Sequence, residues 1–334
     1  MSHEIGKILI QQKQYKKASD IFKKLIDNKP NDLRANFLMG KIQYDLNNVN
    51  KSIFFFKKCN EIQPNTPNIL FNLALALQST GKIKEAKKKF LKLISINPKD
   101  IKSYYGLFML DNKNINSLYY QKLKSLTNDE NISSFEKSLI NFIFSKLEKK
   151  KGNFVNEINY LKLSHEQCFA SNLTYNNQSD FYYKNIISNT FNQIKFEGEF
   201  SEIREFNKSD HLFIIGLPRS GSTLVETIIS HNSKNIYSVG EFHGFNTSIL
   251  NQMGSIIYSK NFKYENYQLT INKKKFQDSL IEKYNNFDKE IYLDKSLENF
   301  FNIDVILEFF PNAKFIHTYR NLNDAIIGIF QAML

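Results

Sequence analysis

The stretch HLFIIGLPRSGSTLVETIIS, residues 211–230, combines three patterns that decide the fold of the second half of the chain. The apolar run HLFIIG contains β-branched residues and predicts a buried parallel strand. A turn rich in Gly and Ser follows it, and STLVETIIS then has the apolar spacing of an amphipathic helix. A strand, a glycine-containing turn and a helix in this order predict an α/β domain with a parallel sheet and an anion-binding loop.

The turn between strand and helix nearly fits the Walker A phosphate loop, G-x-x-x-x-G-K-[ST]. Gly216, Gly221 and Thr223 fit this pattern, but Ser222 stands where the lysine would be. Backbone N–H groups at a helix N-terminus favour an anion, because they are unpaired and the helix dipole is positive there. Arg219 is the one positive side chain of the loop, and no clear Walker B strand follows, so a Mg²⁺-dependent kinase or ATPase is the disfavoured alternative.

A repeat with a period of 34 residues occupies the first hundred residues. Small residues in such a repeat let two helices approach closely, an aromatic ring fills the gap between helical hairpins, and proline ends the second helix. The columns resemble those of the tetratricopeptide repeat (TPR), a helical hairpin that stacks into a solenoid. Four columns share the register: Pro30, Pro64 and Pro98; Gly6, Gly40 and Ala74; Ala18, Ser52 and Ala86; Phe22, Phe56 and Phe90.

These patterns predict three segments along the chain. Residues 1–110 would form about three repeats, and residues 111–205 a helical continuation with a hairpin interrupted at Gly152 and Asn153. Residues 206–334 would form the α/β domain. The concave face of a solenoid suits a protein or peptide partner, and the alternative is a purely structural platform.

Composition indicates a soluble globular protein. A chain of 334 residues with 42% hydrophobic residues is long enough for two packed domains. The net charge of +12 permits an anionic partner, but the basic residues are dispersed over helices, so we expect no nucleic acid partner. Cys59 and Cys168 are too few for a disulfide framework, and no run reaches the roughly 18 apolar residues of a membrane span. We therefore expect a cytoplasmic protein with no signal peptide.

Four segments resemble the motifs of one enzyme family. GLPRSGSTL resembles the 5′-phosphosulfate loop of sulfotransferases, whose usual form is PRSGTTL. SVGEF, with Gly240 and Glu241, LDKSLENFF, with Asp294, Lys295 and Asn299, and FFPNAKFIHTYRNLNDA, with Arg320, follow in the family's order. Behind the repeats, they resemble the bacterial TPR sulfotransferases, relatives of protein-tyrosine sulfotransferases. The resemblance is loose in residues 100–205 and specific in residues 211–324.

The resemblance implies a sulfotransferase that moves a sulfuryl group from 3′-phosphoadenosine 5′-phosphosulfate (PAPS) to an acceptor hydroxyl, without a metal. A sulfuryl group carries one charge fewer than a phosphoryl group, so an arginine, amides and hydroxyls can replace the lysine and Mg²⁺. Arg320 would bind the 3′-phosphate. The residues at the 5′ end would be Pro218, Arg219, Ser220, Gly221, Ser222 and Thr223.

The resemblance also assigns roles in the reaction. Glu241 is the candidate general base, and Lys295 and Arg219 would stabilise the bridging oxygen and the transferring sulfonate. An ordinary structural or solvated role is the alternative for each of them. His243 is an alternative base, although a lone histidine more often lies at the surface. The acceptor hydroxyl remains open between tyrosine, a sugar and a lipid, and the repeats would present a protein or peptide acceptor.

Two departures from the family pattern favour a different hypothesis. Gly328 stands where the family usually has a serine that contacts the 3′-phosphate, a loss of roughly 1.5 to 3 kcal/mol of binding. The sequence also ends inside the helix after Arg320, so we expect a sulfotransferase domain that is incomplete at its C-terminus. The alternative function is a TPR interaction scaffold whose sulfotransferase half is inactive.

Overall fold

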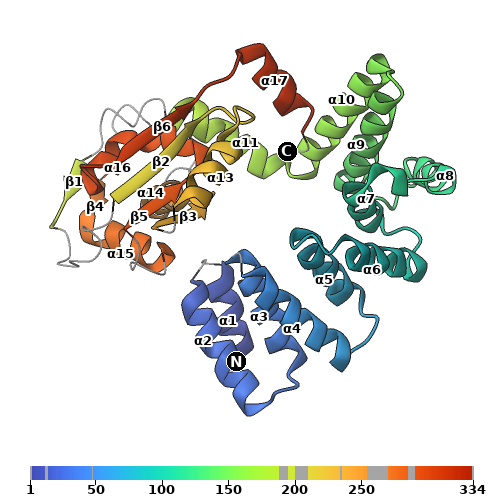
Figure 1. Cartoon of the computed structure of the whole chain (residues 1–334), viewed down its shortest axis with the longest axis horizontal. Coiled ribbons are helices and arrows are strands. Elements are labelled where there is room, and N and C mark those ends of the chain that lie inside the picture. The colour runs from blue at the N-terminus through green and yellow to red at the C-terminus, as the bar shows by residue number, and fades with distance from the viewer. Residues whose placement is uncertain are drawn as a thin grey trace. The chain divides into compact units, whose positions relative to one another are not determined.

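The computed structural model describes residues 2–11, 14–46, 48–187, 195–199, 210–233, 235–253, 270–284 and 290–332. The chain divides into two compact units, Met1–Asn172 and Leu173–Leu334 (Figure 1). The first unit is helical and the second combines helices with parallel sheets, which confirms the predicted solenoid and α/β domain.

The first unit consists of helices that pack against their neighbours in the chain (Figure 1). α1 packs on α2, α3 on α4, α5 on α6 and α9 on α10. The elements are α1 Ser2–Gln11, α2 Tyr15–Asn28, α3 Leu33–Asp45, α4 Val49–Ile62, α5 Pro67–Ser79, α6 Ile83–Ile96, α7 Ile101–Leu110, η1 Asn112–Asn114, α8 Ser117–Leu126, α9 Ser134–Lys150 and α10 Phe154–Ser171.

The glycine and phenylalanine columns of the repeat meet in its core. A Cβ atom on Gly40 would lie 2.7 Å from the ring of Phe56, and one on Gly6 would lie 2.3 Å from the ring of Phe22. Both rings are fully buried. The period of the sequence is therefore a packing period, because each of these glycines leaves the space that a ring of the paired helix fills.

An ion-pair cluster closes the turn between α9 and α10. Gly152 has a φ of +77°, which favours glycine in this tight connection. The buried carboxylate of Glu148 accepts hydrogen bonds from Lys151 Nζ at 2.6 Å and from Asn153 Nδ2 at 3.1 Å. The lysine side chain is 62% exposed, so the charge of this pair faces solvent while the acid anchors the turn.

The second unit is built on a four-stranded parallel sheet with the order β3-β5-β2-β6, and β1 pairs separately with β4 (Figure 1). The predicted strand and helix around the loop correspond to β2 and α13. The elements are α11 Leu173–Phe181, η2 Tyr182–Ile187, β1 Lys195–Glu197, β2 Asp210–Gly216, α13 Ser222–Asn232, β3 Ile236–Gly240, α14 Gly244–Met253, β4 Thr270–Asn272, α15 Lys273–Tyr284, β5 Ile291–Asp294, η6 Leu297–Asn302, α16 Ile303–Phe309, β6 Lys314–Thr318 and α17 Leu322–Phe330.

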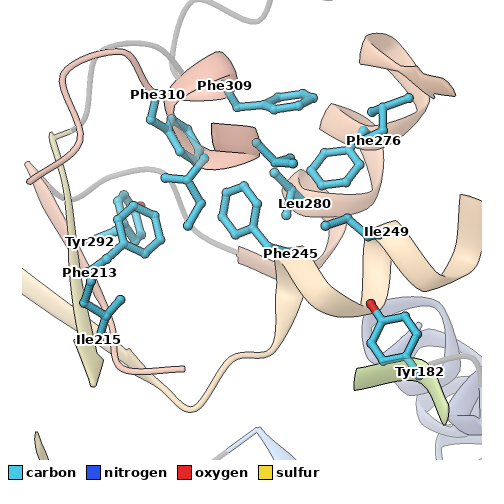
Figure 2. Packing of buried hydrophobic residues seen from close by; sticks show 13 residues of the cluster. Tyr182, Phe213, Ile215, Phe245, Ile249, Phe276, Leu280, Tyr292, Phe309 and Phe310 are labelled. Atoms are coloured by element: carbon cyan, nitrogen blue, oxygen red, sulfur yellow. The ribbon is translucent and has the colours of Figure 1, made fainter. Parts of the chain in front are cut away.

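Aromatic rings fill the space between the sheet and the helices of the second unit (Figure 2). Phe213 of β2 packs edge-on against Phe245 of α14, with 5.8 Å between ring centroids. The ring centroids of Phe276 on α15 and Phe309 on α16 are 4.6 Å apart. β2 is buried along most of its length, which explains its continuous apolar run. This packing fixes the strand from which the glycine-containing loop departs.

Candidate active site at the carboxyl edge of the sheet

The four motifs follow the carboxyl ends of the four strands of the larger sheet. The loop at residues 217–221 follows β2, Glu241 follows β3, Lys295 follows β5 and Arg320 follows β6 by two residues. From β2 the chain moves to one side of the sheet, to β3, and from β5 it crosses β2 to reach β6. Ligands of open parallel sheets bind at the carboxyl ends of the strands, where the strand order changes direction in this way.

The loop after β2 lies against the end of β6. A Cβ atom on Gly216, whose φ is +141°, would lie 2.4 Å from the carbonyl oxygen of Thr318, so the close approach of the two strands requires glycine. The hydroxyl oxygens of Ser220 and Thr318 are 2.7 Å apart. Arg219 has a φ of +66°, an uncommon value for a residue with a side chain. The loop is therefore a tightly wrapped turn anchored to a neighbouring strand.

The helix after this loop begins without a side-chain cap. Gly221, in the left-handed region with a φ of +94°, is the N-cap residue of α13, and no side chain accepts a hydrogen bond from the first turn. Ser222 and Thr223 are the first helical residues, whose backbone N–H groups have no partner within the helix. Ser222, in the place of the Walker A lysine, is buried. This helix end offers donors and a positive dipole to an anion.

Lys295 and Glu241 form the ion pair at the centre of the site. Lys295 Nζ donates a hydrogen bond to Glu241 Oε1 at 2.6 Å, and it lies 3.4 Å from Thr223 Oγ1. The lysine side chain is 7% exposed and the glutamate side chain 57% exposed. The hydrogen bond from Lys295 lowers the pKa of Glu241, partial burial opposes the shift, and the charges of Lys295 and His243 support it. Glu241 is thus an ionised, accessible carboxylate beside a buried cation.

A second carboxylate, absent from the predicted site, approaches the same lysine. Glu226 Oε2 on α13 lies 3.8 Å from Lys295 Nζ, and its other carboxylate oxygen accepts a hydrogen bond from the hydroxyl of Ser238 on β3. The sequence held a weak signal for it, because Glu226 lies three residues after Thr223 and so shares a face of the predicted helix. Ser238 is the first residue of the SVGEF motif, but the resemblance assigned it no role.

Asp294 and Asn299 support the segment that carries Lys295. Both side chains are buried. Asp294 Oδ1 accepts a hydrogen bond from the backbone N–H of Ser296 at 2.7 Å, and the backbone N–H of Lys295 bonds to Gly240 O at 2.9 Å. Burial raises the pKa of Asp294 to about 6, although hydrogen bonds from Ser296 and Asn299 oppose the shift.

His243 links the two segments that hold Glu241 and Lys295. Its φ is +52°, its backbone N–H donates to Ser296 Oγ at 2.7 Å, and its Nδ1 atom pairs with the carboxylate of Glu298. The side chain is 42% exposed. The structure thus gives this histidine a defined partner and a constrained backbone, which the sequence did not indicate.

Arg219 and Arg320 meet at the other side of the loop. Arg320 Nη1 donates a hydrogen bond to the carbonyl oxygen of Arg219 at 3.3 Å, and Arg320 Nε lies 3.9 Å from Asp324 Oδ2. A Cβ atom on Gly328 of α17 would lie 3.2 Å from Cβ and 3.3 Å from Cγ of Arg219. Glycine at residue 328 therefore allows α17 to approach the side-chain stem of Arg219 closely.

Within the described ranges, no three His, Cys, Asp or Glu side chains are arranged so that they could hold a metal ion. Among the helices that the structure describes, none is both long enough and apolar enough to cross a membrane.

Comparison with protein families assigns two parts of the chain. Residues 211–334 match the sulfotransferase family, and residues 1–32, 33–66 and 67–100 each match the tetratricopeptide repeat. The chain therefore carries three tetratricopeptide repeats followed by a domain of the sulfotransferase family, which confirms the resemblance of the motifs.

An uncharacterized protein of Aquifex aeolicus (strain VF5) is 24% identical over 317 residues, which cover 92% of this chain and 40% of that protein. The chain thus spans less than half the length of this relative. The crystal structure of MamA is similar with 18% identity and a TM-score of 0.41, over 49% of this chain and 94% of MamA. TPR-like repeats of a putative kinesin light chain from Podosopora anserina are similar with 13% identity and a TM-score of 0.42, over 51% of this chain and 95% of that one.

Proposed function

We propose that the sulfotransferase domain transfers a sulfuryl group from PAPS to an acceptor hydroxyl. The observation that carries this proposal is the 2.6 Å pair between buried Lys295 and exposed Glu241, close to the uncapped N-terminus of α13. A fixed cation, an accessible carboxylate and an anion-binding helix end are the groups that this transfer requires. The sulfotransferase family uses PAPS as its donor, so the match of residues 211–334 supports the same cosubstrate here.

The loop and the two arginines would bind the cosubstrate. Residues 218–223 would surround its 5′ end, with the backbone N–H groups of Ser222 and Thr223 as donors. Arg320 would pair with the 3′-phosphate, and its half-exposed guanidinium is accessible for this role. The hydrogen bond between Arg320 and Arg219 O supports the assignment, because it joins the strand of the 3′ site to the loop of the 5′ site.

Glu241 would accept the proton of the acceptor hydroxyl while the hydroxyl oxygen attacks sulfur. The new O–S bond forms as the bond between sulfur and the 5′-phosphate oxygen breaks, and that oxygen keeps the electron pair. Lys295 and Arg219 would stabilise the charge that develops there. The lowered pKa of Glu241 keeps it in the basic form at neutral pH, although pairing with Lys295 makes it a weaker base. Catalysis would therefore depend mainly on positioning and on fixed charges.

The repeats would bind the protein partner of the enzyme. Tetratricopeptide repeats expose a concave surface that suits an extended peptide or a partner protein. We therefore propose an acceptor hydroxyl on a protein or peptide.

The test measures by chromatography the conversion of PAPS into 3′-phosphoadenosine 5′-phosphate (PAP). The acceptor in separate assays is a tyrosine peptide, an oligosaccharide or a hydroxylated lipid. We expect acceptor-dependent PAP formation that falls by about a hundredfold or more in Glu241→Gln. Lys151→Met, which breaks the ion pair of the α9–α10 turn, is the control and should keep the activity. PAP formation that Glu241→Gln leaves unchanged would refute the assignment, and the absence of both turnover and nucleotide binding would favour the scaffold hypothesis.

A further inference from the structure

Glu226 occupies an unusual place for a helix glutamate. Its side chain is 13% exposed, and its two carboxylate oxygens have different partners. One oxygen accepts the hydrogen bond from Ser238 on β3, and the other lies 3.8 Å from Lys295 Nζ. A mostly buried carboxylate needs such partners, because burial without them is costly.

The contacts of Glu226 belong to a closed ring of interactions. The backbone N–H of Gly240 donates to Ser238 Oγ at 3.2 Å, and the Ser238 hydroxyl donates to Glu226. Glu226 faces Lys295 Nζ, and the backbone N–H of Lys295 returns to Gly240 O at 2.9 Å. The ring therefore joins α13, the end of β3 and the residue after β5, and Glu241 is the next residue after Gly240.

Lys295 is outnumbered by the negative charges around it. Lys295 faces two carboxylates, Glu241 at 2.6 Å and Glu226 at 3.8 Å. Glu241 is mostly exposed, whereas Glu226 is held on its far side by Ser238. When Glu241 accepts a proton it becomes neutral, and a buried ammonium without a counter-ion would be strongly disfavoured. Glu226 remains as a negative charge beside the lysine.

We propose that Glu226 is a positioning residue, the permanent counter-ion that holds Lys295 charged and in place while Glu241 exchanges its proton with the acceptor hydroxyl. The inference rests on the proposed sulfuryl transfer. Glu226 acts through Lys295 and touches neither substrate. Because Lys295 is shared, Glu226 also weakens the hold of the lysine on Glu241 and leaves Glu241 a better base.

A purely structural role for Glu226, as a link between α13 and β3, makes a different prediction. Glu226→Gln would keep the shape and an acceptor for Ser238, so a structural link would survive without change at Glu241. If Lys295 interacts with both carboxylates, the same substitution leaves Glu241 as its only counter-ion and lowers the pKa of Glu241. Among the residues that the structure describes, the other charged groups near Glu241 are His243 and, paired with it, Glu298. Neither changes in this variant.

The experiment is a pH titration of the Glu241 carboxyl carbon by ¹³C NMR in the full chain labelled at glutamate, with the resonance assigned by its loss in Glu241→Gln. We expect the titration midpoint to move to lower pH in Glu226→Gln. Glu226→Asp, which keeps the charge, should leave the midpoint closer to that of the native protein. Glu290→Gln is the matched control, because the Glu290 carboxylate also accepts a side-chain hydrogen bond, from Asn235, at the opposite end of β5.

An unchanged midpoint in Glu226→Gln, or an equal shift in Glu290→Gln, would overturn the proposal. The titration needs no nucleotide, so it separates this inference from the proposed function. If the protein shows the shift but fails to bind PAP, the proposal that Lys295 is shared would stand and the proposed sulfuryl transfer would not.

Discussion

Two lysine–glutamate pairs with the same 2.6 Å separation lie in the two units of this protein, and their burial is reversed. In the α9–α10 turn the glutamate is buried, and Lys151 is 62% exposed. At the carboxyl edge of the sheet the lysine is 7% exposed, and Glu241 is 57% exposed. The first pair locks a turn, whereas the second presents a carboxylate to solvent from a fixed, buried cation.

The pKa values alone would not separate these two pairs. In both, the hydrogen bond from the lysine is the main cause that lowers the pKa of the glutamate, and burial opposes it. The difference lies in which partner is buried and in the surroundings, since only Lys295 also faces a second carboxylate, a helix hydroxyl and an uncapped helix end. The proposed catalytic pair is therefore distinguished by its burial pattern and not by the shift in the pKa of its acid.

Breaking the two pairs should give the largest contrast. Lys295→Met removes the buried ammonium from between two carboxylates and leaves Glu226, 13% exposed, without its cation, so we expect a loss of about 3 kcal/mol in the free energy of unfolding of the second unit. Lys151→Met removes a cation that is 62% exposed and leaves buried Glu148 with its hydrogen bond from Asn153, so we expect a smaller loss, about 1 to 2 kcal/mol, in the first unit. Urea-dependent hydrogen exchange of peptides from each unit measures both values. Equal losses would contradict the distinction between the pairs.

Asp294, the residue before Lys295, tests how burial of a carboxyl changes the pH dependence of stability. Its folded-state pKa of about 6 lies above the unfolded value, so its contribution to stability is present at low pH and is lost as pH rises through 6. At pH 8 the ionised form should destabilise the second unit by roughly 2 to 3 kcal/mol. Asp294→Asn should therefore stabilise that unit at pH 8 and change little at pH 4. Exposed Asp304→Asn is the control, and a gain for Asp294→Asn that is equal at both pH values would contradict this account.

Gly328 provides the smallest of the expected effects. A side chain at residue 328 would press on the stem of Arg219, so we expect Gly328→Ser to weaken PAP binding by about three- to tenfold, near 1 kcal/mol. Gly328→Ala carries the same Cβ without a hydroxyl and should weaken binding similarly. Calorimetry measures both. Tighter binding by the serine variant would mean that the hydroxyl contact outweighs the crowding.

Much of this architecture could be predicted from the sequence, because it depends on periodic packing and on motif order. The 34-residue columns predicted the stacked helical hairpins, and the HLFIIG run predicted β2. The resemblance assigned Glu241 and Lys295 to one reaction, and the structure brings them together because motifs that follow parallel strands meet at one edge of a sheet.

The remaining features depend on three-dimensional contacts that no motif records. Glu226 is one of many helix glutamates, and only the fold shows that it faces Lys295. The pairing of His243 with Glu298 joins the loop before α14 to η6. The contact of Gly328 with Arg219 depends on how α17 packs over the loop, which neither residue reveals alone.

The most direct test of the central claim is a calorimetric titration of the full chain with PAP. We expect binding at micromolar concentrations that is lost in Arg219→Ala, strongly weakened in Lys295→Met and retained in Lys151→Met. That result would place the nucleotide at the loop and separate the two ion pairs by function. Absence of heat up to millimolar PAP from a folded protein, or equal binding by Arg219→Ala and the native chain, would contradict a phosphosulfate site at the carboxyl edge of the sheet.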